Sequence, residues 1–333
     1  MTTFIANHST YPRIGDRPEQ QRLRRAVDQW EEKEISDEEL EGSLREATSE
    51  VVSEQDKADV DLVTDGGLRR YDPISQWLKE LKGVRLGRLL RFLDTNTYFR
   101  VPIVEKLLRR REFEETSFMQ RDTGYALESL RTLSGEGKRL KVFMTGPVTL
   151  SLCCERGRGF RKVEDLVQEL SLLMAEEVAK LVTAGAAWVQ IEEPLILQRP
   201  EFFPSLSKGL KKIASKKGRG KILLATYFGD SAACYAKLQD LPVDGLGLDC
   251  VSDRGLIEMV ANKGSGKSLA LGVIDGRSIR MEAPEIIEKL ASQIRRVRAP
   301  ELHLTTSCGL EYLPRGRAFE KLTLLARLKE LVQ

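Results

Sequence analysis

The sequence predicts a TIM (β/α)8 barrel, and three observations lead to this fold class. Eight short apolar runs rich in β-branched residues each end in glycine or polar residues. Segments with helical periodicity separate most of these runs, which indicates parallel strands joined by crossover helices. The 333 residues are 41% hydrophobic, enough to fill one large domain. An open doubly wound sheet is the alternative, but no G-x-G-x-x-G motif follows the first run.

The predicted strands are distributed along the whole chain. They span residues 4–9, 61–67, 141–147, 188–194, 222–228, 244–250, 268–275 and 302–308. Helical periodicity is clearest over residues 163–185 and 284–298. The segment GSGKS at 264–268 looks like part of a phosphate-binding loop, but Ala261 stands where the full motif has glycine. Because this segment precedes a strand, we expect it to form a turn.

Two segments exceed the simple alternation of strand and helix. We expect one domain over residues 1–333, with a helical insertion at 10–60 and a helix and hairpin extension at 68–139. These insertions follow the first and second strands, so they should lie at the catalytic rim of the barrel. The charged residues 20–57 are typical of a solvated helix pair. Its basic residues could instead meet an anionic tail such as polyglutamate or phosphate; they are Arg13, Arg22, Arg24 and Arg25.

Composition excludes several classes of protein. Lys and Arg number 53 against 50 Asp and Glu, a net charge of +3, which argues against a nucleic-acid binder that depends on bulk charge. No apolar run reaches the roughly 18 residues of a membrane span, and the N-terminus lacks the features of a secretory signal. Five cysteines are a sparse, odd number, which favours reduced thiols in the cytoplasm.

Polar residues gather at the carboxyl ends of the predicted strands, where this fold carries its active sites. They are His8, Asp65, Thr145, Glu192, Glu193, Thr226, Tyr227, Asp249, Asp275, Ser307 and Cys308. A ring of carboxylates is costly to desolvate unless a ligand, a metal or cations compensate it. The alternation of strand residues turns Glu192 and Asp249 inward. Arg69, Arg70 or Arg277 could instead pair with some of these acids and only close the barrel.

A zinc site is one interpretation of this ring. His8 ends the first strand and Cys308 the last, and these two strands are neighbours in a closed barrel. With Asp249 they would supply nitrogen, sulfur and oxygen donors that zinc accepts. Cys153 and Cys154 lie just past the third strand, and we expect them to be structural.

Nine sequence motifs occur in an order that resembles the order found in one known protein family. They are HSTYPRIG (8–15), VTDGG (63–67), FLDTNTYFRVP (92–102), TGPVT (145–149), QIEEP (190–194), ATYFGD (225–230), VDGLGLD (243–249), LGVIDGRS (271–278) and SCGLEYLPR (307–315). Together they resemble the cobalamin-independent methionine synthases (the MetE family) over nearly the entire chain. This resemblance implies a TIM barrel and methyl transfer from a methylated folate to homocysteine. Most motifs resemble the family's N-terminal, non-catalytic barrel, whereas SCGLEYLPR is similar to the catalytic C-terminal barrel.

The resemblance also implies roles for individual residues. The family's zinc holds homocysteine as a thiolate. Cys308 matches the family's late cysteine ligand and Asp249 its glutamate, but its His-x-Cys pair would fall within ATYF at 225–228, which holds neither residue type. Zinc is therefore doubtful, and any remodelled site would use Cys308, Asp249 and His8. Glu192 matches the acid that holds the homocysteine amine, and Thr10 a small hydroxyl residue of the pocket, whereas Gly67 replaces an expected carboxylate.

Two functions from different classes remain open. The first is a methyltransferase, with a methylated folate or a methylcorrinoid as donor and a thiol such as homocysteine as acceptor. We expect catalytic roles for Glu192, Asp249 and Cys308, and substrate binding by Thr10, Asp65, Glu192, Glu193, Tyr227 and Asp275. The second is a non-catalytic binding subunit that works with a separate catalytic barrel or a corrinoid protein. A decarboxylase of the uroporphyrinogen type is a third interpretation, but no arginine-rich tetrapyrrole cleft is evident.

Overall fold

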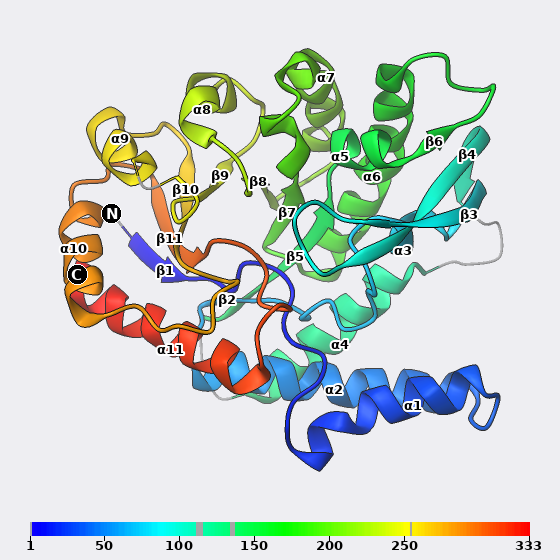
Figure 1. Ribbon diagram of the computed structural model, residues 1–333, viewed down its shortest axis with the longest axis horizontal. Helices are drawn as coiled ribbons and strands as arrows, with labels where there is room; N and C mark the ends of the chain where they lie inside the picture. Colours follow the sequence, from blue (N-terminus) through cyan, green and yellow to red (C-terminus); the bar gives the residue numbers. More distant parts are fainter. Residues whose placement is uncertain (1, 111–115, 134–136, 254) are drawn as a thin grey trace. The chain divides into compact units, whose positions relative to one another are not determined.

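The structure, a computed structural model, describes residues 2–110, 116–133, 137–253 and 255–333. Eight strands form one sheet in the spatial order β1, β11, β10, β9, β8, β7, β5 and β2 (Figure 1). Their bounds are β1 Thr2–Ile5, β2 Leu62–Val63, β5 Arg139–Thr145, β7 Trp188–Glu192, β8 Lys221–Thr226, β9 Gly245–Asp249, β10 Ser268–Ile274 and β11 Glu301–Thr306. Ala6, just past β1, bridges in parallel to Leu62 of β2, so the two ends of this order meet and the sheet closes.

The predicted TIM (β/α)8 barrel is confirmed, and all eight predicted strands are present within a few residues of their expected bounds. Both faces of these strands are covered: every residue of β7, β9 and β10 is buried. The segment at 264–268 is a turn, as expected. Gly264 has a φ of 68°, a left-handed conformation that glycine adopts without strain, and β10 begins at Ser268.

Helices connect most of the strands. The longer ones are α1 Arg22–Glu31, α2 Asp37–Lys57, α4 Phe118–Thr132, α6 Val163–Ala184, α7 Phe203–Ala214, α10 Pro284–Ile294 and α11 Arg315–Val332. The shorter ones are α3 Ser75–Leu78, α5 Pro147–Cys153, α8 Ser231–Gln239, α9 Leu256–Lys263 and the 3-10 turns Pro18–Gln21, Pro194–Leu197 and Pro200–Phe202. The predicted helices at 163–185 and 284–298 correspond to α6 and α10.

The chain divides into two compact units. The first comprises Met1–Arg69, Asp122–Val142 and Gly247–Gln333, and the second comprises Arg70–Arg121 and Phe143–Leu246. In the first unit, α1 and α2 lie side by side and form the helical insertion (Figure 1). A capping box begins α2, because the Ser36 hydroxyl accepts from the Glu39 amide while the Glu39 carboxylate accepts from the Ser36 amide.

The second unit carries the predicted hairpin. β3 (Leu81–Arg91) pairs antiparallel with β4 (Tyr98–Arg110), and β6 (Glu155–Arg156) adds a short parallel strand to β4. The hairpin forms because Phe99 and Val101 are buried on one face of β4 while Tyr98 and Arg100 on the other are exposed. Of the predicted extension at 68–139, residues 111–115 and 134–136 lie outside the described residues.

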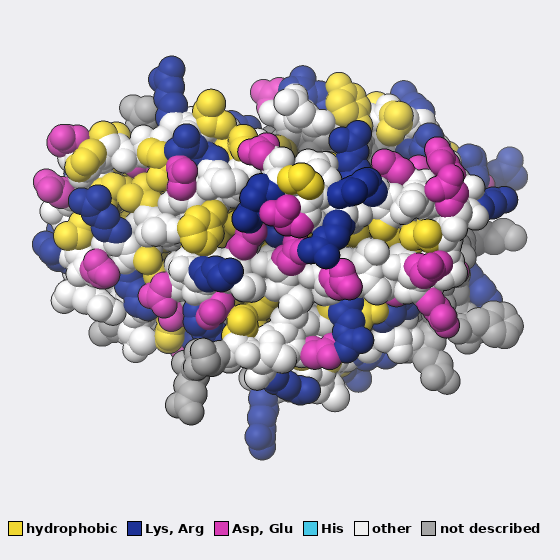
Figure 2. Space-filling model, turned by 90° about the horizontal axis from the view of Figure 1, so that it is seen from below, with side chains coloured by type: hydrophobic (Ala, Val, Ile, Leu, Met, Phe, Trp, Pro, Cys, Tyr) yellow, Lys and Arg dark blue, Asp and Glu magenta, His cyan; other side chains and the backbone are white. Residues whose placement is uncertain are grey.

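The surface carries both signs of charge. Figure 2 shows acidic, basic and hydrophobic side chains interspersed over one face of the molecule, in keeping with the net charge of +3. Among the described residues, no helix is both long enough and apolar enough to cross a membrane.

Candidate functional site

In the second unit, the Glu192 carboxylate ends β7 and is held by two neutral donors. Gln190 lies two residues earlier on the same face of β7, and its amide nitrogen donates to Glu192 Oε1 at 2.8 Å. The Tyr227 hydroxyl, just past the neighbouring β8, donates to Oε2 at 3.1 Å. Glu192 is 6% exposed, so its carboxylate is nearly buried at the carboxyl end of the barrel wall. The structure thus brings together Glu192 and Tyr227, two of the predicted site residues.

A strained turn follows this pair. Phe228 has a φ of 60°, which a non-glycine residue rarely adopts, and its ring packs edge-on against Tyr227 with centroids 4.8 Å apart. Thr226 and Ser231 are linked by their hydroxyls across the same turn at 3.2 Å. Ala225 and Thr226 end β8, and the turn that follows them presents Tyr227 to Glu192.

The adjacent Glu193 has a different environment. Its Oε1 accepts from the Val148 amide at 2.8 Å, and its Oε2 accepts from the amide and hydroxyl of Thr149 at 2.7 and 2.6 Å. These donors belong to the first turn of α5, so Glu193, just past β7, caps the helix that follows the neighbouring strand β5. Burial raises the pKa of Glu193 to about 7, against the opposing effect of its hydrogen bonds. Substrate binding by Glu193 stays a prediction, and both its oxygens already accept hydrogen bonds within the fold.

The first unit holds Cys308, just past β11. Its thiol donates to the Gly309 carbonyl at 3.4 Å, and the side chain is 1% exposed. Gly276 packs directly on this residue, since a Cβ there would lie 2.8 Å from the Cys308 carbonyl oxygen and 3.1 Å from Sγ. Burial, with the negative charges of Glu311 and Asp249, raises the pKa of Cys308 well above its usual value. Cys308 is therefore a protonated thiol in this environment.

Three predicted acids of the first unit shape the turns that follow their strands. One oxygen of each carboxylate accepts from the backbone amide two residues later, the arrangement of an Asx turn. The pairs are Asp65 with Gly67 at 3.0 Å, Asp249 with Val251 at 3.0 Å and Asp275 with Arg277 at 2.8 Å. Asp249 also accepts from the Ser252 amide at 2.9 Å. A structural role is therefore established for one oxygen of each acid, and their catalytic or binding roles stay predictions.

Thr10 has a partner that the sequence did not indicate. Its hydroxyl donates to the Glu311 carboxylate, and the Leu310 amide donates to the Thr10 carbonyl at 3.0 Å. Gly309 makes room for this contact, because a Cβ there would overlap both the Thr10 hydroxyl and the Glu311 carboxylate. The segments after β1 and β11 are thus tied together, although 301 residues separate Thr10 from Glu311. The sequence indicated a pocket residue at Thr10 from its hydroxyl side chain alone and did not predict its contact with Glu311.

The fit of zinc can be tested on the three candidate ligands. Burial and the nearby Lys141 lower the pKa of His8 well below its usual value, and its Nδ1 lies 2.9 Å from the Ser9 hydroxyl. The Cys308 thiol donates to the Gly309 carbonyl at 3.4 Å, and one carboxylate oxygen of Asp249 is engaged in a turn. Within the described ranges, no group of three or more His, Cys, Asp or Glu residues is placed to hold a metal ion. The residues present do not fit the family's zinc site.

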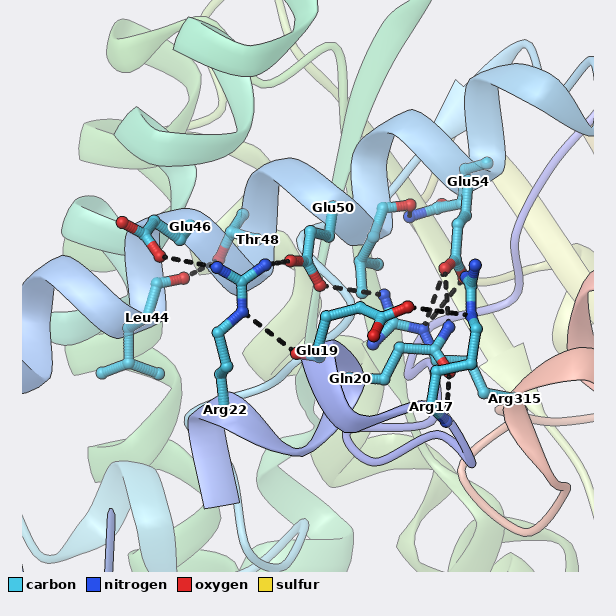
Figure 3. Close-up of polar contacts among 12 residues, drawn as sticks. Arg17, Glu19, Gln20, Arg22, Leu44, Glu46, Thr48, Glu50, Glu54 and Arg315 are labelled. Carbon is cyan, nitrogen blue, oxygen red and sulfur yellow. Dashed lines mark hydrogen bonds and ion pairs between the residues drawn. The ribbon is translucent and has the colours of Figure 1, made fainter. Parts of the chain in front are cut away.

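Two of the arginines considered for an anionic tail, Arg22 and Arg24, pair with acids of the same insertion. The Arg22 guanidinium lies between Glu46 and Glu50 of α2, at 3.7 and 2.7 Å, and the buried Arg315 contacts Glu54 at 3.0 Å (Figure 3). Arg24 lies 4.0 Å from Asp28, and Arg25 donates to the Pro18 carbonyl at 2.6 Å. These contacts support the interpretation of an ordinary charged helix face over that of a site for an anionic tail.

Two arginines that could have paired with the acids at the strand ends have other partners. Arg69 pairs with Glu41 and Asp122 at 2.7 and 2.9 Å, and Arg70 donates to the Phe143 carbonyl at 2.5 Å. Cys153 and Cys154 are half-buried, and burial raises the pKa of both thiols, that of Cys153 to about 12.

The fold and these residues define a class of protein: a TIM barrel with a buried carboxylate held by an amide and a phenol at the end of a wall strand. The family profile described as "Cobalamin-independent synthase, N-terminal domain" matches residues 82–299, or 218 of the 333 residues. The chain therefore belongs to the cobalamin-independent methionine synthase family, as its motifs predicted.

Individual relatives differ in length. The 5-methyltetrahydropteroyltriglutamate–homocysteine methyltransferase of Histophilus somni is 28% identical over 94% of this chain, which spans only 43% of that relative. The methionine synthase of Saccharolobus islandicus is 27% identical, and the match covers 96% of this chain and 93% of that one.

Solved structures share the fold. A B12-independent methionine synthase from Shewanella sp. W3-18-1, in complex with selenomethionine, has a TM-score of 0.76 at 20% identity and covers 99% of this chain and 97% of its own. A putative vitamin-B12-independent methionine synthase from Listeria monocytogenes has a TM-score of 0.75 at 15% identity, covering 100% and 99%.

Proposed function

We propose that this barrel binds a thiol amino acid such as homocysteine and methylates its sulfur. The observation that carries the proposal is the Glu192 carboxylate, held by Gln190 and Tyr227 at the carboxyl end of β7. A nearly buried carboxylate that accepts from an amide and a phenol attracts an ammonium group, so it would hold the amine of an amino acid. Family membership and the name of the full-length-matching archaeal relative agree with this substrate class.

The chemistry is a simple group transfer. The acceptor sulfur forms a bond to the methyl carbon, while the donor's bond to that carbon breaks. With a methylated folate as donor, the thiol proton ends on the donor nitrogen. A methylcorrinoid, delivered by a corrinoid protein, is the other donor class. No step is assigned to zinc, because the residues present do not fit it. We assign Glu192 to the acceptor amine, with Tyr227 of the same unit as a further substrate-binding residue. The substrate-binding roles of Thr10, Asp65 and Asp275 stay predictions from the sequence.

A second candidate function has its own support. Among the residues that the structure describes, no three His, Cys, Asp or Glu side chains are grouped to hold a metal, which favours a non-catalytic binding subunit that works with a separate catalytic barrel. Such a subunit would retain the amino-acid contact at Glu192. It would need no catalytic role for Cys308 or Asp249.

Calorimetry with homocysteine and a radioactive methyl-transfer assay test both candidates. We expect homocysteine to bind, and Glu192→Gln to weaken binding at least about tenfold, the effect of a lost charge-assisted hydrogen bond. Glu201→Gln is the matched control, because Glu201 is an exposed acid of the same unit paired with Arg199 at 2.6 Å. Transfer from methylfolate or methylcobalamin would support the enzyme. Binding without transfer from either donor would leave the binding subunit, and absence of homocysteine binding would refute both.

A further inference from the structure

The β3–β4 hairpin of the second unit is strongly basic. Residues 82–110 contain eight Lys and Arg against two Asp and Glu, a formal charge of +6, although the whole chain carries only +3. Arg85 pairs with Glu105 at 2.7 Å, Arg88 with Glu155 at 3.4 Å and Arg91 with Asp94 at 4.0 Å. These three pairs are solvent-exposed, which makes each of them weak.

The same hairpin exposes large apolar side chains. Leu89 and Tyr98 are 56% and 59% exposed, and Leu86 and Leu90 are 37% and 39% exposed. In the antiparallel register, Leu89 pairs with Arg100 and Arg91 with Tyr98. Because paired residues point to the same side, these four share one face. An apolar centre surrounded by arginines has the composition of a protein interface.

The tip of the helical insertion in the first unit has the opposite charge. Residues 28–39 contain seven acids and one lysine, a formal charge of −6, and each of these charged side chains is exposed. Trp30 lies among them and is 41% exposed. Its indole nitrogen donates to the Asp37 carboxylate at 2.7 Å, which fixes the ring at the junction of α1 and α2. This acidic tip therefore also has an aromatic centre within a charged surface.

We propose that the basic hairpin of one molecule binds the acidic tip of a second copy of this chain. The charges of the two surfaces are equal and opposite, and each carries exposed apolar groups that contact with the other would bury: Leu89 and Tyr98 on the hairpin, Trp30 on the tip. Arginine beside an indole adds cation–π attraction. Every copy has both surfaces, so the proposed dimer holds two such contacts related by a two-fold axis. Binding of the basic hairpin to a nucleic acid or to an anionic membrane would not explain why the tip of the helical insertion is acidic.

Two charge-reversed variants test the proposal by analytical ultracentrifugation. The hairpin variant carries Arg88→Glu, Arg91→Glu and Arg100→Glu, and the tip variant carries Glu31→Lys, Glu34→Lys and Glu38→Lys. The unmodified chain is expected to dimerise at about 50 mM salt and to dissociate at least about tenfold more readily at about 500 mM, because screening weakens surface charge pairs. Each variant alone should be monomeric. An equimolar mixture should form a heterodimer, since both of its contacts are again between opposite charges.

Further variants show whether these two surfaces, and not the net charge of the chain, hold the dimer together. Lys208→Glu with Lys211→Glu reverses two exposed charges on α7 and should leave the dimer unchanged. Trp30→Ala should weaken it without altering the net charge. Circular dichroism of each variant checks that it is folded. A chain that is monomeric at every salt concentration, or variants that fail to associate when mixed, would overturn the proposal. Loss of single-stranded RNA or anionic-vesicle binding in the hairpin variant, with an unchanged association state, would likewise overturn it.

Discussion

The cap that Glu193 forms on α5 depends on the absence of a side chain at Gly146. Gly146 is the N-cap of α5, with φ −76° and ψ 162°, a conformation that alanine adopts without strain. A Cβ at this position would lie 2.3 Å from Glu193 Oε1 and 2.5 Å from its Cγ. Gly146→Ala therefore displaces the Glu193 carboxylate while leaving the local backbone acceptable, so its effect reports on the cap alone.

The magnitude follows from the contacts that the carboxylate makes. Loss of a helix cap costs about 0.5–2 kcal/mol. Leaving a buried acceptor and its donors unsatisfied costs about 1–3 kcal/mol more. We expect Gly146→Ala to lower the free energy of unfolding by about 3 kcal/mol. At about 2.1 cal/mol/K of unfolding entropy per residue, that corresponds to a fall in Tm of about 4 °C for 333 residues.

Urea denaturation and differential scanning calorimetry measure this change, and Gly42→Ala is the control. Gly42 lies within α2 with nothing within 4 Å of an added Cβ. Alanine there should stabilise by about 0.5–1 kcal/mol through helix propensity. If Gly146→Ala is as stable as the unmodified chain, the carboxylate moves aside at no cost and the cap contributes nothing.

Two further predictions concern titratable groups. The pKa of Glu193, about 7 in the fold against 4.5 unfolded, means that its contribution to stability is full below pH 4.5 and is lost as the pH rises through 7. Between pH 4.5 and 7, the free energy of unfolding of the unmodified chain should thus fall by on the order of 3 kcal/mol relative to that of Glu193→Gln. Urea denaturation at several pH values measures this difference, and parallel stability profiles of the two chains would contradict the raised pKa of Glu193. Burial also raises the thiol pKa of Cys153, Cys250 and Cys308. Ellman's reagent at pH 8 should therefore titrate fewer than five thiols in the native chain and all five in guanidinium. Rapid reaction of all five thiols in the native chain would refute this prediction.

Local patterns were sufficient to predict the barrel and its insertions. The strand positions follow from apolar runs, because this signal arises between neighbouring residues. Alternation along β7 also placed Glu192 and Glu193 on opposite faces. The ordered motifs identified the family, which the profile match over residues 82–299 confirmed.

Only the tertiary structure decided which partner each of those two glutamates has. Glu193 reaches amides of α5 44 and 45 residues earlier in the chain, and Thr10 meets Glu311 across 301 residues. The order of strands around a barrel predicts which strand ends are neighbours, but the partner of each side chain depends on how the segments that follow the strands pack. The sequence therefore determined which residues stand at the ends of the strands. Three-dimensional packing determined which of them cap helices and which shape turns. It also determined that the Glu192 carboxylate is held by an amide and a phenol at the candidate site.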